Sequence, residues 1–286
     1  MNKQITYIES VIRQNLNEES WNWLTDKAGQ VRKEKNASAL HEAFALISKK
    51  TGNKKVETNT PAQTVTGMEP GEIYTRDWPI DRLSRVWLIM QIDPSDKKSY
   101  LAKTGSLFSG ASMNELVALY SALPILAYPQ DWKMRCAEGI RSNIGTVLEA
   151  IMYENAYPFH FLDEANFNQM VLKAFFTEKN VDRIIGIDQR ANGELAHILF
   201  DYAHERWAAG RTVNPQLWRL TGRYINDANF SDLQRLWNNG SEKEKKAAVL
   251  ACSQSEYEPA RHLWEEGGDI KKEIAERRIN WHNLGS

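Results

Sequence analysis

The feature that most constrains this chain is the spacing of its apolar residues, which follows helical periodicity along most of its length. The longest apolar stripe at that spacing consists of Trp132, Cys136, Ile140, Ile144, Val147, Leu148 and Ile151. No run of alternating apolar and polar residues competes with these stripes, so strands are not expected. The sequence therefore predicts an all-α fold.

Capping residues predict where several helices begin. Ser112 with Glu115, and Ser241 with Glu244, have the spacing of a capping box. Asp77 and Ser231 are expected to cap two further helices. Amphipathic helices joined by short turns are typical of repeat proteins, so we predict an array of antiparallel helix pairs, an irregular α-solenoid resembling HEAT-type repeats. An irregular helical bundle is the alternative.

Three segments differ in their pattern and suggest a division of the chain. Residues 1–50 contain short N-terminal helices, and residues 78–286 are expected to form the helical-repeat domain. Residues 51–77 between them have no sustained period and contain Thr, Gly, Pro and Asn, which predicts a long loop or linker. A segment of this kind is either disordered or a lid over a site.

Composition excludes several classes of protein. With 36 basic and 37 acidic residues mixed along the chain, nothing suggests a nucleic-acid partner. No apolar run is long enough to insert into a membrane, and the N-terminus lacks the apolar centre of a signal peptide, which predicts a cytoplasmic protein. The two cysteines, Cys136 and Cys252, lie in apolar helical contexts, so we expect buried thiols rather than a disulfide or a thiolate metal site.

Polar residues of unusual type interrupt two predicted helices in the middle of the chain. The first helix spans about residues 163–177, and Asn168, Gln169 and Lys173 accompany its apolar face. The second spans about residues 193–209, and Gly210 follows as its C-cap. Amides and an amine beside large aromatic residues are typical of a polar spot in an apolar ligand pocket, although such residues also cap loops and bridge helix ends.

Asp201, His204 and Glu205 place three ligand-type side chains along the second predicted helix. This face could hold a metal ion with help from another helix, or it could form salt bridges to Arg206 or Arg211. A salt-bridged helix surface is the favoured interpretation, and we predict no metal and no cofactor.

Arginines and aromatic residues are also concentrated here. The arginines are Arg190, Arg206, Arg211, Arg219 and Arg223. Guanidinium groups suit carboxylate or phosphate ligands, but Asp188 and the acidic residues of the second helix can neutralise several of them. Trp207 and Trp218 fit either a core or a pocket.

A family resemblance rests on this region. The segments NAYPFHFLDEANFNQMVLKAFFTE, RIIGIDQRAN and LAHILFDYAHERWAAGR, followed by NPQLWR, resemble the EboA family over roughly residues 78–240. The resemblance implies a gene cluster that makes, modifies or exports a small molecule, including pigment precursors in cyanobacteria. Such clusters also encode a membrane prenyltransferase, a metal-dependent hydrolase, a sugar-phosphate-cyclase relative and a TIM-barrel protein. The family supplies no catalytic residue set to carry over.

Three hypotheses follow from these residues. The first is a non-catalytic binding or scaffold protein of a secondary-metabolite pathway, whose partners are other pathway proteins, a metabolite or both. The second is an enzyme with a pocket between the two central helices, acting on an anionic small molecule, and the third is a purely structural ion-pair network. The candidate binding residues are Asn168, Gln169, Lys173, Asp188, Arg190, Asp201, His204, Glu205, Arg206, Trp207, Arg211 and Trp218.

Overall fold

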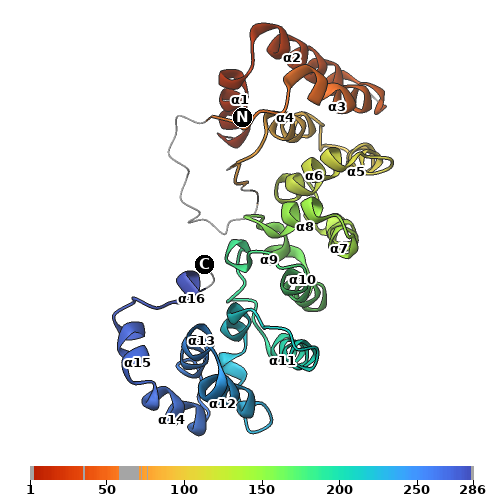
Figure 1. The fold of residues 1–286 in the computed structure, drawn as a ribbon. Helices are drawn as coiled ribbons and strands as arrows, with labels where there is room; N and C mark the ends of the chain where they lie inside the picture. Colours follow the sequence, from red (N-terminus) through yellow and green to blue (C-terminus); the bar gives the residue numbers. More distant parts are fainter. Residues whose placement is uncertain (1–2, 35, 58–70, 72, 76, 285–286) are drawn as a thin grey trace. The chain divides into compact units, whose positions relative to one another are not determined.

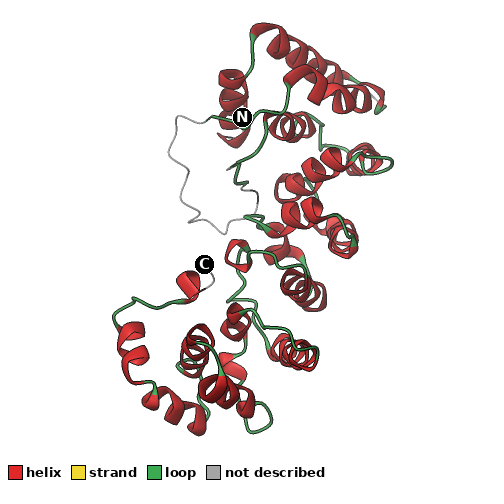
Figure 2. Cartoon of the chain, viewed as in Figure 1, coloured by secondary structure: helices red, strands yellow, loops and turns green. Residues whose placement is uncertain are grey.

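The computed structural model describes residues 3–34, 36–57, 71, 73–75 and 77–284, and the lid-or-linker prediction for residues 51–77 falls largely outside this range. The described residues form helices joined by loops and no strand, as Figure 2 shows, so the all-α prediction is confirmed. An isolated β-bridge joins Lys55 to Pro79. Chain contacts group residues 1–162 and 163–286 into two compact units.

The first unit contains helices α1 to α9 (Figure 1). Helix α4 packs on α1, α3 and α6, α2 packs on α3, and α8 packs on α6 and α7. The α-helices are α1 (Lys3–Asn15), α2 (Glu18–Lys33), α3 (Ser38–Thr51), α4 (Ile80–Ile89), α5 (Lys97–Leu107), α6 (Met113–Ala122), α7 (Lys133–Arg141), α8 (Gly145–Met152) and α9 (Tyr157–Phe161). Two short 3₁₀ helices, η1 (Leu123–Ile125) and η2 (Pro129–Trp132), lie between α6 and α7.

The second unit is organised around α13, which packs on α12, α14, α15 and α16. Its α-helices are α10 (Glu164–Phe176), α11 (Gly193–Ala208), α12 (Phe230–Asn239), α13 (Glu242–Cys252), α14 (Glu258–Glu266), α15 (Gly268–Ala275) and α16 (Trp281–Leu284). Its 3₁₀ helices are η3 (Val181–Arg183), η4 (Pro215–Leu220) and η5 (Gly222–Tyr224). A regular HEAT-type arrangement of these helices stays a prediction, as does the division at residues 50 and 77.

The capping residues explain several helix starts. Both predicted capping boxes are present, at the beginning of α6 and of α13. Two other predicted caps are wrong. Pro79 precedes the first residue of α4, while Asp77 has a left-handed φ of 65° and pairs with Lys55. Helix α12 begins one residue before Ser231, so Ser231 lies inside its first turn.

The longest apolar stripe is divided between two helices. Helix α7 ends at Arg141, and α8 begins at Gly145. Ser142 has an extended backbone, and the half-buried Ile144 is the N-cap residue of α8. The apolar period continued across this break, because residues on both sides pack into the same unit: Cys136 and Ile151 are both fully buried.

Candidate functional site

The two central helices begin and end as their sequences predict. Asp163 caps α10 by accepting a hydrogen bond from the backbone N–H of Asn166 at 2.8 Å. Asn192 caps α11 in the same way through the N–H of Leu195, also at 2.8 Å. At the other end of α11, Gly210 has a φ of +66°, which is the left-handed conformation that ends many helices.

An amide pair connects α10 to the start of α11. Asn168 is 2% exposed, and its Nδ2 donates to Asn192 Oδ1 at 3.2 Å. Asn192 Nδ2 returns a hydrogen bond to Asn168 Oδ1 at 2.9 Å. Since Asn192 also caps α11, the pair fixes the start of that helix against α10. Gln169 lies next to Asn168 but is exposed, and Lys173 is half-buried.

Arg219 forms ion pairs with Asp182 and Asp188, two acidic residues that precede α11 in the sequence. Its Nε donates to Asp188 Oδ1 at 2.6 Å, and its Nη1 donates to Asp182 Oδ1 at 2.7 Å. Burial lowers the pKa of the 8% exposed Arg219, but the hydrogen bonds and charges of Asp188 and Asp182 outweigh it and raise the pKa above its usual value. Asp188 therefore belongs to a structural ion network. Neutralisation of the arginines by nearby acidic residues was one of the two alternatives that the sequence left open.

The aromatic residues at the end of α11 form a layered core. Trp218 is fully buried, and its ring stacks on Trp207 with centroids 5.7 Å apart and an interplanar angle of 21°. Arg235 of α12 covers Trp207, with its guanidinium carbon 4.3 Å from the ring centroid. Trp218 is thus core, whereas the half-buried Trp207 lies at the boundary between core and surface.

Two further arginines hold local structure. Arg206 donates from Nε and Nη2 to the Thr212 carbonyl, at 3.0 and 2.8 Å, and so fastens the chain that follows α11. Arg190 lies over the Phe167 ring at 4.5 Å, and burial lowers the pKa of its guanidinium. By contrast, Arg211 and Glu205 are exposed.

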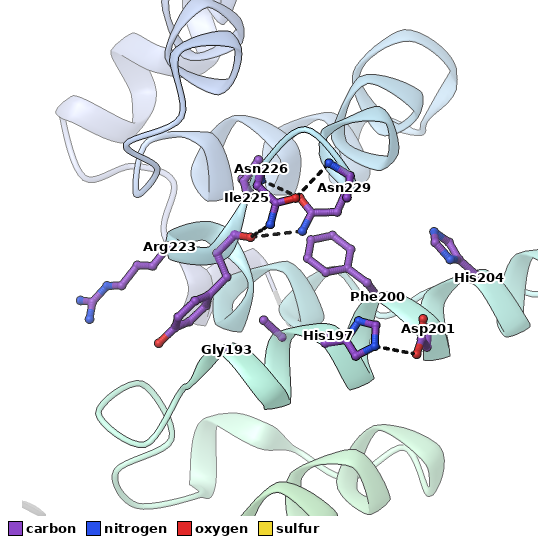
Figure 3. A pocket seen from close by; sticks show the side chains of 12 residues that line it. Gly193, His197, Phe200, Asp201, His204, Arg223, Ile225, Asn226 and Asn229 are labelled. Atoms are coloured by element: carbon purple, nitrogen blue, oxygen red, sulfur yellow. Dashed lines mark hydrogen bonds and ion pairs between the residues drawn. The ribbon is translucent and has the colours of Figure 1, made fainter.

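A groove of about 550 Å³ runs along α11, between this helix and residues 223–229 (Figure 3). We call it the α11 groove. Its apolar lining includes Phe200, which is 4% exposed, and Ile225, which is 6% exposed. Its polar lining includes His197, Asp201 and His204, which come from successive turns of α11. The groove therefore combines an apolar base with ionisable groups that face solvent.

The histidines of the α11 groove lie beside carboxylates. His197 Nε2 is 3.6 Å from Asp201 Oδ2, and these side chains are 71% and 62% exposed. His204 Nε2 is 2.8 Å from Asp232 Oδ2, which belongs to α12 and is largely buried. Asp201, which was expected to form a salt bridge with Arg206 or Arg211, pairs with His197 instead.

Two other grooves lie nearby in the second unit: one shares Arg223 and Tyr224 with the α11 groove, and the other contains Trp207 of α11. The Arg223 groove, of about 390 Å³, is lined by Arg223, Tyr224, Gln254 and Trp281, among others. The Trp207 groove, of about 310 Å³, is lined by Trp207, Arg211, Arg235, Asn239 and Glu244, among others. None of the three grooves includes a residue of α10, so they do not lie between the two central helices.

Sequence reasoning missed the second walls of these grooves. The wall of the α11 groove is residues 223–229, where Asn229 Oδ1 accepts from the Asn226 N–H at 2.9 Å and Asn226 Oδ1 accepts from the Ala228 N–H at 2.9 Å. Asparagines at this spacing predict a turn, and that was the one available signal. Asp232 and Arg235 gave no signal, because α12 reads as an ordinary amphipathic helix.

Within the residues that the structure describes, no three or more His, Cys, Asp or Glu side chains cluster in a way that could bind a metal ion. None of the described helices combines the length and the apolar character needed to cross a bilayer.

The fold and the grooves define an all-α protein whose second unit carries open grooves of mixed polarity around α11. Residues 4–222 match the model of a family described as "Metabolite traffic protein EboA", so the chain belongs to the EboA family. This match includes the N-terminal helices and ends before residues 223–229. The family associates the chain with a metabolite-related role. No curated protein and no solved structure matches the chain.

Proposed function

We propose that this protein is a non-catalytic binding protein of a small-molecule pathway and that the α11 groove holds the metabolite. The observation that carries this proposal is the composition of the groove, in which Phe200 and Ile225 form an apolar base beneath exposed imidazole and carboxylate groups. Ligand sites commonly have volumes of about 300–1,000 Å³, and they combine an apolar lining with a few polar groups that orient the ligand. The volume of about 550 Å³ lies within that range.

Other parts of the proposal concern the setting of the protein. We place the protein in the cytoplasm, and we expect other proteins of the same pathway to bind it while it holds the metabolite. The family description supports a metabolite as the ligand, because it names metabolite traffic. Cell fractionation with an antibody to the native protein tests the location, and recovery in a compartment other than the cytoplasm would contradict it.

A tryptophan placed in the groove tests ligand binding. Ala228 is exposed and lines the α11 groove, so Ala228→Trp should fill the space that the metabolite needs. Ala208 is also exposed but lines none of the three grooves, so Ala208→Trp is the matched control. Surface changes of this kind should alter the free energy of unfolding by no more than about 0.5 kcal/mol.

The probe is a total small-molecule extract of the source cells, incubated with the purified proteins and analysed by native mass spectrometry. We expect a compound to stay bound to the wild-type protein and to Ala208→Trp, and to be lost from Ala228→Trp. The proposal fails if the wild-type protein retains no compound, or if Ala228→Trp retains it equally.

An enzyme is the second candidate, because two histidine–carboxylate pairs border the same groove. His204 beside Asp232 has the geometry of a general base with an orienting carboxylate. This candidate predicts that His204→Gln abolishes formation of the pathway product in cells while the protein still retains the compound from the extract. A binding protein without catalytic activity predicts a different result: if His204→Gln still retains the compound, the cells should form the pathway product at the wild-type rate.

A further inference from the structure

The Trp207 groove has a charge pattern unlike that of the α11 groove. It lies between the end of α11, residues 210–212, and the C-terminal half of α12, and Glu244 of α13 completes its lining. Arg211 and Arg235 both contribute to this lining, and both are exposed. Across the described part of the chain, neither arginine forms an ion pair with a carboxylate.

The single carboxylate of this groove is already engaged. Glu244 Oε2 accepts hydrogen bonds from the backbone N–H and the hydroxyl of Ser241, both at 2.8 Å. These bonds form the capping box that begins α13. Glu244 therefore has a structural role, and one of its two carboxylate oxygens is occupied in the cap.

One of the two guanidinium groups is held in place by the aromatic layer. Arg235 lies 4.3 Å from the centroid of Trp207, and Trp207 stacks on the fully buried Trp218. A cation over an indole face keeps the N–H groups at the edge of the guanidinium available for hydrogen bonds. Because the side chain is already ordered, binding a ligand at Arg235 costs less conformational entropy than binding at a free surface arginine.

Two helix C-termini lie next to the groove, and three of their carbonyl groups accept hydrogen bonds from backbone N–H groups. Carbonyl groups at a helix C-terminus carry partial negative charge when they lack donors. Here the N–H of Gly210 donates to the Trp207 carbonyl at 3.0 Å, and the N–H of Arg211 donates to the Arg206 carbonyl at 2.9 Å. At the end of α12, the N–H of Gly240 donates to the Leu236 carbonyl at 2.9 Å.

We propose that the Trp207 groove binds the acidic group of a small molecule, a carboxylate or a phosphate, through the guanidinium groups of Arg211 and Arg235. Guanidinium forms paired, charge-assisted hydrogen bonds with either group, so the shared chemistry is a planar or tetrahedral oxyanion. The groove volume of about 310 Å³ suits such a group with a short attached segment. This site is separate from the one in the proposed function, since Ala228 and the histidines of the α11 groove do not line it.

Nuclear magnetic resonance of the Trp207 indole N–H reports on this groove directly. The full-length protein is labelled with ¹⁵N at tryptophan, and the resonance is assigned through Trp207→Phe. Sodium phosphate and sodium benzoate are titrated separately, at constant ionic strength maintained with sodium chloride. We expect one or both anions to shift the Trp207 resonance in a saturable manner. A shift with phosphate alone identifies a phosphate site, and a shift with benzoate alone identifies a carboxylate site.

Matched variants decide whether the two arginines bind the anion. Arg211→Gln and Arg235→Gln should each weaken the apparent affinity about tenfold or more, because each removes a charge-assisted hydrogen-bonding group. Arg235→Lys keeps the charge and should bind more tightly than Arg235→Gln. Arg141→Gln, an exposed arginine of α7 outside the groove, is the control and should bind as the wild-type protein does.

Two results would overturn the proposal. The first is the absence of a saturable shift of the Trp207 resonance with either anion in the wild-type protein. The second is unchanged affinity in both glutamine variants while their spectra keep the dispersion of the folded protein. Neither result bears on the α11 groove, whose test uses a different residue and a different probe.

Discussion

A buried ion pair in the first unit allows a sharp test of what stabilises it. Asp81 and Arg85 of α4 are 3% and 2% exposed. Arg85 Nη1 donates to Asp81 Oδ2 at 2.7 Å, and Arg85 Nε donates to the Phe44 carbonyl of α3 at 3.1 Å. Ser48, also in α3, donates its hydroxyl to Asp81 Oδ2 at 2.6 Å. The pair therefore fastens α3 to α4.

The isosteric change Asp81→Asn removes the charge that compensates Arg85. The asparagine oxygen can still accept the hydrogen bonds from Ser48 and Arg85, so the loss comes from leaving the Arg85 charge buried without a counter-charge. Removing one partner of a buried ion pair costs about 3–5 kcal/mol. Because whole domains are stabilised by only about 5–15 kcal/mol, much of the stability of this unit should be lost.

Urea denaturation followed by circular dichroism measures this loss, provided that the m-value stays constant between variants. Glu138→Gln is the matched control, since the Arg135–Glu138 pair is 40% and 45% exposed and should contribute only about 0–1 kcal/mol. The double change Asp81→Leu with Arg85→Met should recover much of the loss, because no buried charge then stays unpaired. A loss below about 1 kcal/mol for Asp81→Asn would refute the reasoning.

Two further outcomes concern the thiols and one glycine. Burial raises the pKa of both thiols, that of Cys252 to about 12. Cys136 and Cys252 should therefore stay protonated and unreactive towards Ellman's reagent at neutral pH, and both should react in urea. Reaction in the native state would contradict their burial. Gly139→Ala would place a Cβ atom 2.5 Å from the Tyr120 ring and should lower the free energy of unfolding by about 1–3 kcal/mol. The Cβ atom of Gly29→Ala meets nothing within 4 Å, so this change should raise the free energy of unfolding by about 0.5–1 kcal/mol in the same urea assay.

Much of the secondary structure could be predicted from the sequence because helix starts depend on neighbouring residues. The capping boxes at Ser112 and Ser241 involve residues only three positions apart, and both are present. Gly210 was recognisable as a helix end, since glycine adopts the left-handed conformation readily. The break between α7 and α8 was not predicted, because apolar spacing continued through Ser142 and Ile144.

The roles of the candidate binding residues were less predictable than the helices that carry them. Asn168 and Trp218 read as polar and aromatic members of a pocket, yet both are buried, and Asn168 is paired with Asn192. His204 was a reasonable candidate, and it does line a groove. Its partner Asp232 could not be predicted, because the two residues lie far apart in the sequence and on different helices.

By itself, the sequence determined the all-α fold, the capping boxes of α6 and α13, and two buried thiols without a disulfide, since each follows from residue type and spacing within a few turns of helix. Only the tertiary structure decided which charges are neutralised. Arg219 forms ion pairs with Asp182 and Asp188, which lie 37 and 31 residues away in the sequence, whereas Arg211 and Arg235 meet no carboxylate among the residues described. The physical reason is that an ion pair depends on a few ångströms between side chains of different elements, and helix periodicity carries no information about that distance.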